Sequence, residues 1–260
     1  MKLNICHLYP DLMDTYGDRG NIISIVKRCK WRNISVTIKN LSTGDKHSAY
    51  DYDFYFFGGG QDKAQSKVAK DLQNKAKALK KAVAQGAVLL SICGGYQLLQ
   101  NYFKTQDGEK IPGISLFDAY TEGTSTRMTG NLLIAINSNL QDEIKQTYQP
   151  LANNQYFTTN LIGFENHSGK TYLEKGVQPL GKVIKGAGNN GKDQTEGAVY
   201  NNAFGCYLHG SLLPKNPHFA DYLISKALEK KYGKVNLSPL DDTIEWQAHK
   251  DAANRISSQA

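Results

Sequence analysis

Two residues of this chain, Cys93 and His209, have the types and surroundings needed for nucleophilic chemistry. Cys93 follows the apolar run Ala87–Leu90 and precedes two glycines, an order that predicts a buried strand, a tight turn and then a helix. Such an elbow holds a thiol at the top of a sheet, where the N–H groups of the helix start favour the thiolate. The alternative is a buried structural cysteine that ends a core strand.

A thiol nucleophile needs a base, and His209 is the best placed of the six histidines. It follows a predicted strand over 204–208 and is itself followed by Gly210. If that strand is parallel to the one before Cys93, both residues emerge at the same edge of the sheet. The alternative is a turn histidine that has no role in chemistry.

Backbone N–H groups near Cys93 could stabilise an oxyanion. Gly94 directly follows the cysteine and is the usual first donor at such an elbow. The second donor could be Gly59 or Gly60, in a run of three glycines that follows another predicted strand. Glycine lets the backbone come close to a substrate. The alternative is an ordinary tight turn between a strand and a helix.

The elements that position these residues alternate between strand and helix in the first half of the chain. Periodicity predicts strands over 3–8, 34–39, 51–57 and 87–90, and helices over 21–32 and 62–85. This order predicts an α/β fold with a flavodoxin-like core, in which an open, mostly parallel sheet is flanked by helices. Ligands of such folds bind outside the carboxyl ends of the strands.

The second half of the chain is richer in predicted strands. Short strands are expected over 114–120, 131–136, 161–164, 181–184, 197–200 and 204–208, and helices over 217–232 and 240–256. The polar stretch 137–160 is interpreted as an insertion, and residues 237–260 as a helical extension. Without internal repeats or a clear linker, the chain is expected to form a single domain over 1–260.

Composition indicates an ordinary globular protein of 260 residues, with 40% hydrophobic and 21% charged residues. No apolar run approaches the roughly 20 residues that span a bilayer, and the N-terminus lacks the features of a signal peptide. A cytoplasmic location is therefore expected. The four cysteines, Cys6, Cys29, Cys93 and Cys206, lack the spacing of metal-binding pairs, so we expect reduced thiols and no metal site.

The net charge is +7, and much of the excess lies between Lys63 and Lys81. These lysines fall on the polar face of a predicted helix, which favours a solvated face over a nucleic-acid surface. No RNA-binding signature or helix-turn-helix pattern accompanies the charge. We therefore expect no nucleic-acid partner.

Several sequence blocks resemble class I (triad) glutamine amidotransferases of the cobyric acid synthase branch. Within that branch the resemblance is greatest to the glutaminase subunits of lipid II isoglutaminyl synthases. The blocks follow one another over most of the chain: GDRGNII at 17–23, FGGGQD at 57–62, ICGGYQL at 92–98, residues 120–130, GFENHSG at 163–169 and YLHGSLLPKNP at 207–217.

The resemblance implies that Cys93 attacks the side-chain amide of L-glutamine to form a thioester and release ammonia. His209 would take the thiol proton and return a proton to the leaving ammonia. Gly94 and one of Gly59 or Gly60 would hold the oxyanion.

The same resemblance assigns substrate-binding roles. Arg127 matches the substrate-binding arginine, and a guanidinium suits the α-carboxylate of glutamine. Without the resemblance it would be interpreted as a surface arginine. Gln97, one helical turn after the cysteine, would help to hold the glutamine. Glu165 and His167 would line the pocket or, by a slight preference, build the turn around it.

One position departs from the pattern of the family. Many triad amidotransferases carry a glutamate two residues after the histidine, where this chain has Ser211. Either a Cys–His pair suffices, or an acid arrives from elsewhere, and our hypothesis is that a partner subunit supplies it.

The chain has no ATP-binding phosphate loop, since the glycine-rich stretch 186–193 lacks the Lys-Ser/Thr ending. No cofactor is therefore expected on this chain. The resemblance implies a heterodimer with a Mur-ligase-like subunit that carries ATP and Mg²⁺ and amidates the D-glutamate α-carboxyl of lipid II to D-isoglutamine. The lysines between Lys63 and Lys81 could add at most a weak, peripheral attraction to anionic lipid.

Three alternatives remain open at the level of sequence. They are a cobyric-acid-type amidotransferase component, a cysteine hydrolase of the peptidase kind, and a non-catalytic binding subunit. Gln97 and Arg127 favour a free amino acid over a peptide, because they offer groups for an α-carboxylate. The intact set of Cys93, His209 and glycines argues against a binding subunit.

Overall fold

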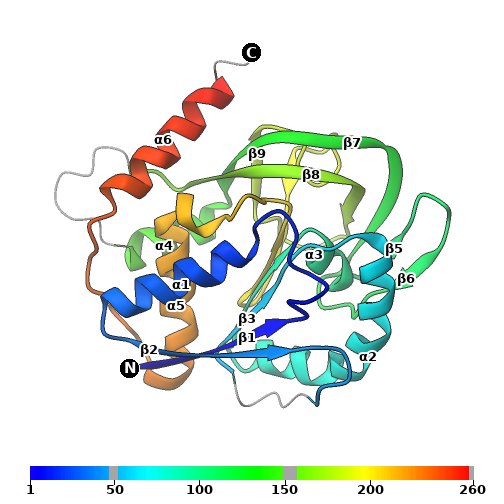
Figure 1. Ribbon diagram of the computed structural model, residues 1–260. Helices are drawn as coiled ribbons and strands as arrows, with labels where there is room; N and C mark the ends of the chain where they lie inside the picture. Colours follow the sequence, from blue (N-terminus) through cyan, green and yellow to red (C-terminus); the bar gives the residue numbers. More distant parts are fainter. Residues whose placement is uncertain (47–51, 149–156, 258–260) are drawn as a thin grey trace.

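The computed structural model describes residues 1–46, 52–148 and 157–257, and its centre is a six-stranded sheet (Figure 1). The strands of this sheet lie in the order β11-β12-β4-β3-β1-β2. Their bounds are β1 Lys2–Leu8, β2 Ser35–Leu41, β3 Phe54–Phe57, β4 Val88–Ile92, β11 Ala198–Tyr200 and β12 Ala203–Cys206.

All neighbouring strands of the central sheet are parallel except β11, which runs antiparallel to β12. The order β2-β1-β3-β4-β12 is that of flavodoxin-like sheets. The predicted open, mostly parallel α/β sheet is therefore confirmed. The carboxyl ends of β3, β4 and β12 are neighbours at one edge, where the glycine run, Cys93 and His209 follow them.

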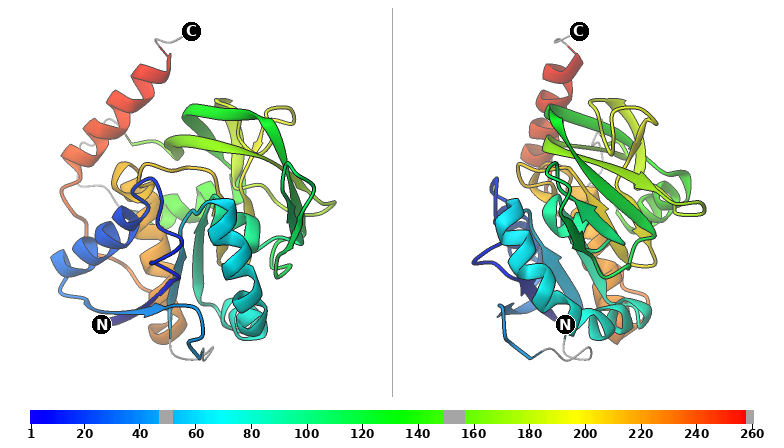
Figure 2. Two further views of the ribbon diagram at one scale, coloured as in Figure 1. Left: turned by 45° about the vertical axis from the view of Figure 1, so that its right-hand side comes forward. Right: turned by 90° about the vertical axis from the view of Figure 1, so that its right-hand side faces the viewer.

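Helices cover both faces of the central sheet (Figure 2). On one side lie α1 (Arg19–Trp31) and α5 (Pro217–Tyr232), and on the other lie α2 (Asp62–Ala84) and the short α3 (Gly94–Leu98). Every residue of β3 and β4 is buried, as expected for strands that are covered on both faces. The core is thus centred on the two strands that lead into the turn at 58–60 and into Cys93.

Helix α2 shows the predicted apolar stripe, since Val68, Leu72, Leu79 and Val83 are buried. One of its lysines departs from the expected solvated face. Lys75 is buried and forms an ion pair with Asp71, one turn earlier on the same helix. This pairing compensates for the burial of the lysine charge.

A second six-stranded sheet lies beside the carboxyl edge of the central sheet (Figures 1 and 2). Its strands are β5 Tyr102–Lys104, β6 Lys110–Pro112, β7 Ala119–Ile136, β8 Asn160–Leu173, β9 Gly181–Lys185 and β10 Thr195–Glu196. β7 and β8 form an antiparallel pair much longer than the predicted strands over 131–136 and 161–164. Only the last two residues of the predicted strand 114–120 lie in a strand, as the first residues of β7.

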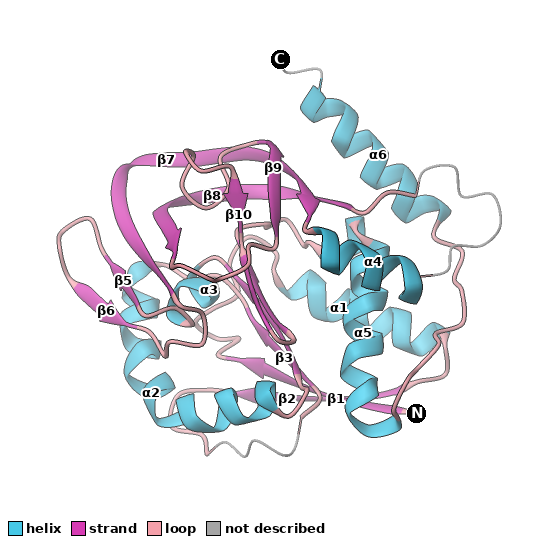
Figure 3. Cartoon of the chain, turned by 180° about the vertical axis from the view of Figure 1, so that it is seen from behind, coloured by secondary structure: helices cyan, strands magenta, loops and turns pink. Residues whose placement is uncertain are grey.

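The polar stretch 137–160 contains a helix that its composition did not predict. α4 (Ser138–Thr147) is capped by Asn137, whose side chain accepts a hydrogen bond of 3.0 Å from the Leu140 N–H group. Leu140 and Ile144 are buried, and α4 packs against α5 (Figure 3). The part of the interpreted insertion at 149–156 lies outside the described residues.

The last helix in the described part of the chain is α6 (Thr243–Ser257), which matches the predicted last helix. This helix extends away from the body of the molecule (Figure 1), although Trp246 near its start is fully buried. It packs against the 3-10 turn η1 (Leu213–Lys215) and against β7 and β8.

Candidate active site

Cys93 lies at the elbow between β4 and α3, as predicted. Its backbone is in an unusual conformation for a residue with a side chain, with φ 49° and ψ −109°. The Cys93 N–H group donates a hydrogen bond of 2.8 Å to the carbonyl of Cys206 on the neighbouring strand β12. A Cβ added at Gly95 would lie 2.5 Å from the carbonyl oxygen of Phe57, so only glycine fits where the elbow packs on the end of β3.

His209 is completely buried and follows β12. Its Nδ1 donates a hydrogen bond of 3.0 Å to Oδ1 of Asp18, which is also completely buried. The other ring nitrogen, Nε2, has no hydrogen-bond partner among the described residues and is therefore the nitrogen available to Cys93. Burial alone would lower the pKa of His209, but the interactions with Cys93 and Asp18 outweigh it and raise that pKa to about 10.

Asp18 corrects the expectation that a partner subunit supplies an acid for the histidine. The structure places this carboxylate, from the loop before α1 in the same chain, at the position that orients the imidazole. The sequence signal was present, because Asp18 belongs to the block GDRGNII at 17–23, but that block had no assigned role. The contact joins residues 191 positions apart, which periodicity cannot reveal.

Ser211 has a definite place although it is not an acid. Its Oγ donates a hydrogen bond of 2.6 Å to the carbonyl of Gly17. It also lies against Gly20, where an added Cβ would approach the Ser211 Oγ to 2.0 Å. The residue two positions after His209 thus holds the segment 17–20, and that segment carries Asp18.

The two candidate oxyanion donors in the glycine turn at 58–60 have different surroundings. The Gly59 N–H group already donates a hydrogen bond of 2.8 Å to Oδ2 of Asp18, so this amide is not free to bind a substrate. The amide nitrogen of Gly60 lies beside Gly94, 2.9 Å from where a Cβ on Gly94 would stand. Gly60 and Gly94 are therefore the pair of amides placed next to Cys93.

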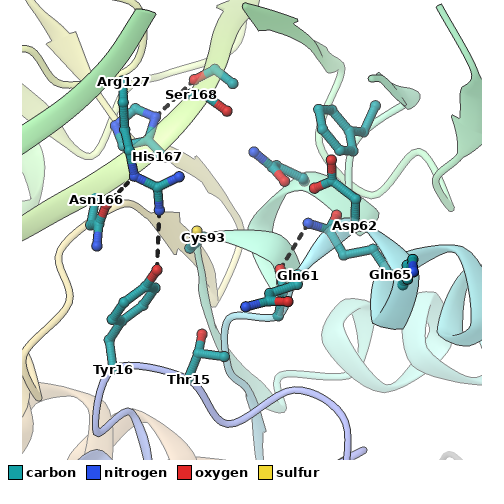
Figure 4. Close-up of a pocket in the computed structure, with 15 residues that line it drawn as sticks. Thr15, Tyr16, Gln61, Asp62, Gln65, Cys93, Arg127, Asn166, His167 and Ser168 are labelled. Carbon is teal, nitrogen blue, oxygen red and sulfur yellow. Dashed lines mark hydrogen bonds between the residues drawn. The ribbon is translucent and has the colours of Figure 1, made fainter. Parts of the chain in front are cut away.

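Cys93 opens into a pocket of about 450 Å³ that Gly60, Gln97 and Arg127 also line (Figure 4). His209 and Gly94 are not among the residues that line this pocket. The Arg127 guanidinium is exposed and donates from Nε to Asn166, over 2.6 Å. Gln97 is nearly buried, and its Nε2 donates a hydrogen bond of 3.1 Å to the hydroxyl of Tyr207.

Tyr16 contacts both Arg127 and His209, and the sequence analysis did not identify it as a site residue. Its hydroxyl accepts a hydrogen bond of 3.1 Å from Nη2 of Arg127. Its ring stands edge-on to the ring of His209, with 5.1 Å between the ring centroids. Both contacts depend on long-range folding, so local sequence patterns did not indicate them.

This geometry can be set against known proteins. Residues 4–217 match the CobB/CobQ-like glutamine amidotransferase domain. The chain belongs to this family. It is therefore a glutamine-hydrolysing amidotransferase, as the sequence blocks predicted.

Two relatives of this amidotransferase are similar over nearly the whole chain. Both are named subunit GatD of lipid II isoglutaminyl synthase (glutamine-hydrolyzing). The one from Staphylococcus aureus is 37% identical and the alignment covers 98% of this chain and 97% of that protein. The one from Streptococcus pneumoniae is 38% identical, with 94% and 87% covered.

Other relatives of the amidotransferase are more distant. A probable cobyric acid synthase from Methanococcus maripaludis is 31% identical, and the alignment covers 74% of this chain but 36% of that protein. A solved glutamine amidotransferase from Thermotoga maritima is 14% identical and superimposes with a TM-score of 0.52, covering 98% and 97% of the two chains. That likeness shows a shared fold.

Glu165 and His167, both on β8, make different contacts near the pocket of the amidotransferase. Glu165 accepts hydrogen bonds of 2.7 and 2.9 Å from the N–H groups of Ala187 and Gly188, so it holds a turn, as the sequence analysis slightly preferred. His167 lines the pocket, and its ring stacks on that of Tyr207, with centroids 3.5 Å apart and planes at 4°.

The remaining chemistry-bearing groups form no second centre within the described ranges. All four cysteines are free, and Cys6, Cys29 and Cys206 are completely buried. No group of three or more His, Cys, Asp or Glu side chains among the described residues could hold a metal ion. None of the described helices is both long and apolar enough to cross a membrane.

Proposed function

We propose that this chain is the glutaminase subunit of a lipid II isoglutaminyl synthase. The observation that carries the proposal is the set of Cys93, His209 and Asp18 at a pocket that also contains Arg127. Near full-length similarity to two GatD subunits supports the choice of synthase. A role in cobyric acid synthesis has less support, because this chain spans only 36% of the cobyric acid synthase relative.

In the proposed reaction, the Cys93 thiolate attacks the side-chain amide carbon of L-glutamine. The carbonyl electrons move onto oxygen, and the N–H groups of Gly60 and Gly94 stabilise the resulting oxyanion. His209, which holds the thiol proton, transfers a proton to the amide nitrogen, and ammonia leaves as the carbonyl re-forms. A γ-glutamyl thioester with Cys93 remains.

Water then cleaves the thioester. His209 accepts a proton from the attacking water, the same two amides hold the second oxyanion, and the Cys93 thiol departs with that proton. The products are glutamate and ammonia, formed from one glutamine and one water. Asp18 keeps Nδ1 of His209 protonated throughout, so that Nε2 always faces the reacting atoms.

The acceptor side of the reaction belongs to a second protein. We propose a Mur-ligase-like partner, MurT, that forms a heterodimer with this chain and holds ATP and Mg²⁺. The partner would activate the α-carboxyl of D-glutamate in lipid II, and ammonia from this chain would convert it to D-isoglutamine. The location is proposed to be cytoplasmic, with at most peripheral attraction of the exposed α2 lysines to anionic lipid.

The experiment that tests this function separates ammonia supply from amidation. The co-purified complex is given lipid II, ATP and Mg²⁺ with either glutamine or an ammonium salt, and the product is followed by mass spectrometry. We expect Cys93→Ala to abolish amidation from glutamine and to leave amidation from ammonium intact. Amidation from glutamine by the Cys93→Ala complex would exclude the proposal, as would loss of amidation from both nitrogen sources.

A further inference from the structure

Two residues in the first turn of α2 line the pocket that contains Cys93, and the side chain of each carries a hydrogen-bond acceptor. Asp62 and Gln65 are three residues apart, so they share one face of the helix, and both line the pocket. Neither residue was assigned a role by the sequence blocks. The question is which part of a substrate they would meet.

Gln65 carries an unsatisfied buried acceptor. The side chain is 2% exposed, and its Nε2 donates a hydrogen bond of 3.0 Å to the carbonyl of Gly60, which fixes the orientation of the amide. Its Oε1 has no hydrogen-bond partner among the described residues. A carbonyl oxygen can only accept, so the missing partner is a donor.

Asp62 adds negative charge beside that oxygen. Within the described parts of the chain, its carboxylate forms no ion pair with a lysine, arginine or histidine. Desolvation raises the pKa of this carboxyl, and the charge of Asp107 adds to the rise, while Arg127 acts in the opposite direction. A cation bound in the pocket would supply the missing ion pair and would favour the charged form of the Asp62 carboxyl.

Arg127 and Asp62 stand on opposite sides of the pocket, with Cys93 between them in the view of Figure 4. A free α-amino acid has the matching pair of charges on one carbon. Its carboxylate suits the guanidinium of Arg127, and its ammonium carries three N–H donors for Asp62 and Gln65. The side chain is then left to extend toward Cys93.

We propose that Asp62 and Oε1 of Gln65 form the subsite for the α-ammonium group of the substrate. The inference rests on the proposed glutaminase function and adds a selectivity to it. The pocket accepts glutamine with a free amino group and rejects N-acylated or peptide-linked glutamine, in which that nitrogen is uncharged. Asp62 is then a specificity-determining residue.

An acidic residue in the first turn also stabilises a helix through its dipole, and Asp62 would do so at any α2 start. That role does not account for the unpaired oxygen of Gln65. It would also change the stability of the protein rather than its choice between ligands. The two roles are therefore separable by measuring selectivity.

The test measures binding in the full-length Cys93→Ala chain by titration calorimetry, because that variant does not consume the ligand. Two ligands are compared: L-glutamine, and 4-carbamoylbutanoate, which is glutamine without its amino group. We expect the chain to prefer glutamine by tenfold or more. Adding Asp62→Asn should weaken glutamine binding about tenfold, leave 4-carbamoylbutanoate unchanged and so remove the preference.

Two further variants serve as controls. Asp107→Asn removes a nearby carboxylate that does not line the pocket and should keep the preference for glutamine. Asp62→Glu keeps the negative charge and should restore part of the preference for glutamine that Asp62→Asn removes. A preference retained in Asp62→Asn, or no preference at the outset, would overturn the subsite while leaving the glutaminase proposal standing. Failure to bind either ligand would instead remove the proposed function and the subsite with it.

Discussion

At the scale of single residues, Asp18 links two parts of the site. One oxygen of its carboxylate accepts from His209 and the other from Gly59. The same group therefore sets the tautomer of the base and the conformation of the turn that presents the Gly60 amide. Such an acid had been expected from a partner, and the hydrogen bond between Asp18 and His209 places the proposed nucleophile, base and acid all in this chain.

Replacing this acid tests its role. We expect Asp18→Asn to lower kcat for glutamine hydrolysis by about 10²- to 10⁴-fold, because an amide no longer selects the protonated Nδ1 tautomer. KM should change little, since Asp18 does not line the pocket. Steady-state kinetics check both values. Asp11→Asn, a change of an exposed carboxylate, is the matched control, and an unchanged kcat in Asp18→Asn would contradict the assignment.

The four thiols should differ sharply in reactivity. Desolvation raises the pKa of Cys6 and of Cys29 to about 12, and these two thiols and Cys206 are fully buried. We therefore expect diazo-oxo-norleucine, an electrophilic glutamine mimic, to label Cys93 alone in the folded protein. Peptide mapping by mass spectrometry identifies the site. Labelling that persists in Cys93→Ala would show that another residue is the nucleophile.

At the scale of elements, two segments complete the site from outside the central sheet. The loop before α1 brings Tyr16 and Asp18, and Ser211 holds it through the carbonyl of Gly17. The long pair β7 and β8 brings Arg127 and Asn166 over the carboxyl edge of the sheet. The nucleophile elbow belongs to the central sheet, whereas the residues around it depend on how these two segments dock.

The contact between Gly20 and Ser211 offers a test of that docking. A side chain in Gly20→Ala would meet the Ser211 hydroxyl at 2.0 Å and displace the segment that carries Asp18. We expect a loss of kcat of tenfold or more with little loss of stability, because alanine favours the helix by up to about 1 kcal/mol. Adding Ser211→Gly should recover much of the activity. A double variant no better than Gly20→Ala would show that this contact is not the cause.

How far the sequence predicts these elements depends on how local their signals are. The apolar stripe of α2 and the β-branched or aromatic runs of β2 and β3 were recognised because their periods are short. β7 and β8 were underestimated, since their outer parts, around Arg127 and His167, are polar and glycine-containing. Their extended form comes from pairing with each other, which only the folded chain shows.

At the scale of the whole molecule, a buried glutamate joins the two sheets behind the site. Glu196 of β10 is completely buried and accepts a hydrogen bond of 2.6 Å from the N–H group of Tyr207, just after β12. Its second oxygen has no partner among the described residues. Burial raises the pKa of this carboxyl to about 8, so the folded protein holds its proton more tightly than the unfolded chain does.

This shift predicts a definite pH dependence. Between a pH of about 4.5 and about 8, the unfolded chain loses the Glu196 proton while the folded protein keeps it, so folding becomes less favourable as pH rises. Glu196→Gln mimics the protonated acid and removes this effect. In urea unfolding, the free energy of unfolding of Glu196→Gln should exceed that of the wild type by an amount that grows from pH 5 to pH 8. The growth should be about 1.4 kcal/mol for each pH unit in this range. A gain that does not change with pH would contradict the shift.

The candidate site as a whole was predictable in part. Cys93, Gly94 and His209 follow strands whose ends meet in a parallel sheet, so pattern and topology placed them together. Asp18 and Tyr16 were not predictable, because their hydrogen bonds join residues 191 and 111 positions apart in the chain. Residues at such long-range contacts carry no periodic signal, and only the folded geometry reveals them.

The most direct test of the account is ammonia release from glutamine by the wild type and by Cys93→Ala, each with and without the proposed partner subunit. Because the proposed nucleophile, base and acid all lie in this chain, the wild type alone should release glutamate and ammonia in equal amounts, and the proposed partner should raise the rate. Cys93→Ala should release neither under any condition. Equal release by Cys93→Ala, or no release by the wild type even with the partner present, would contradict the central claim.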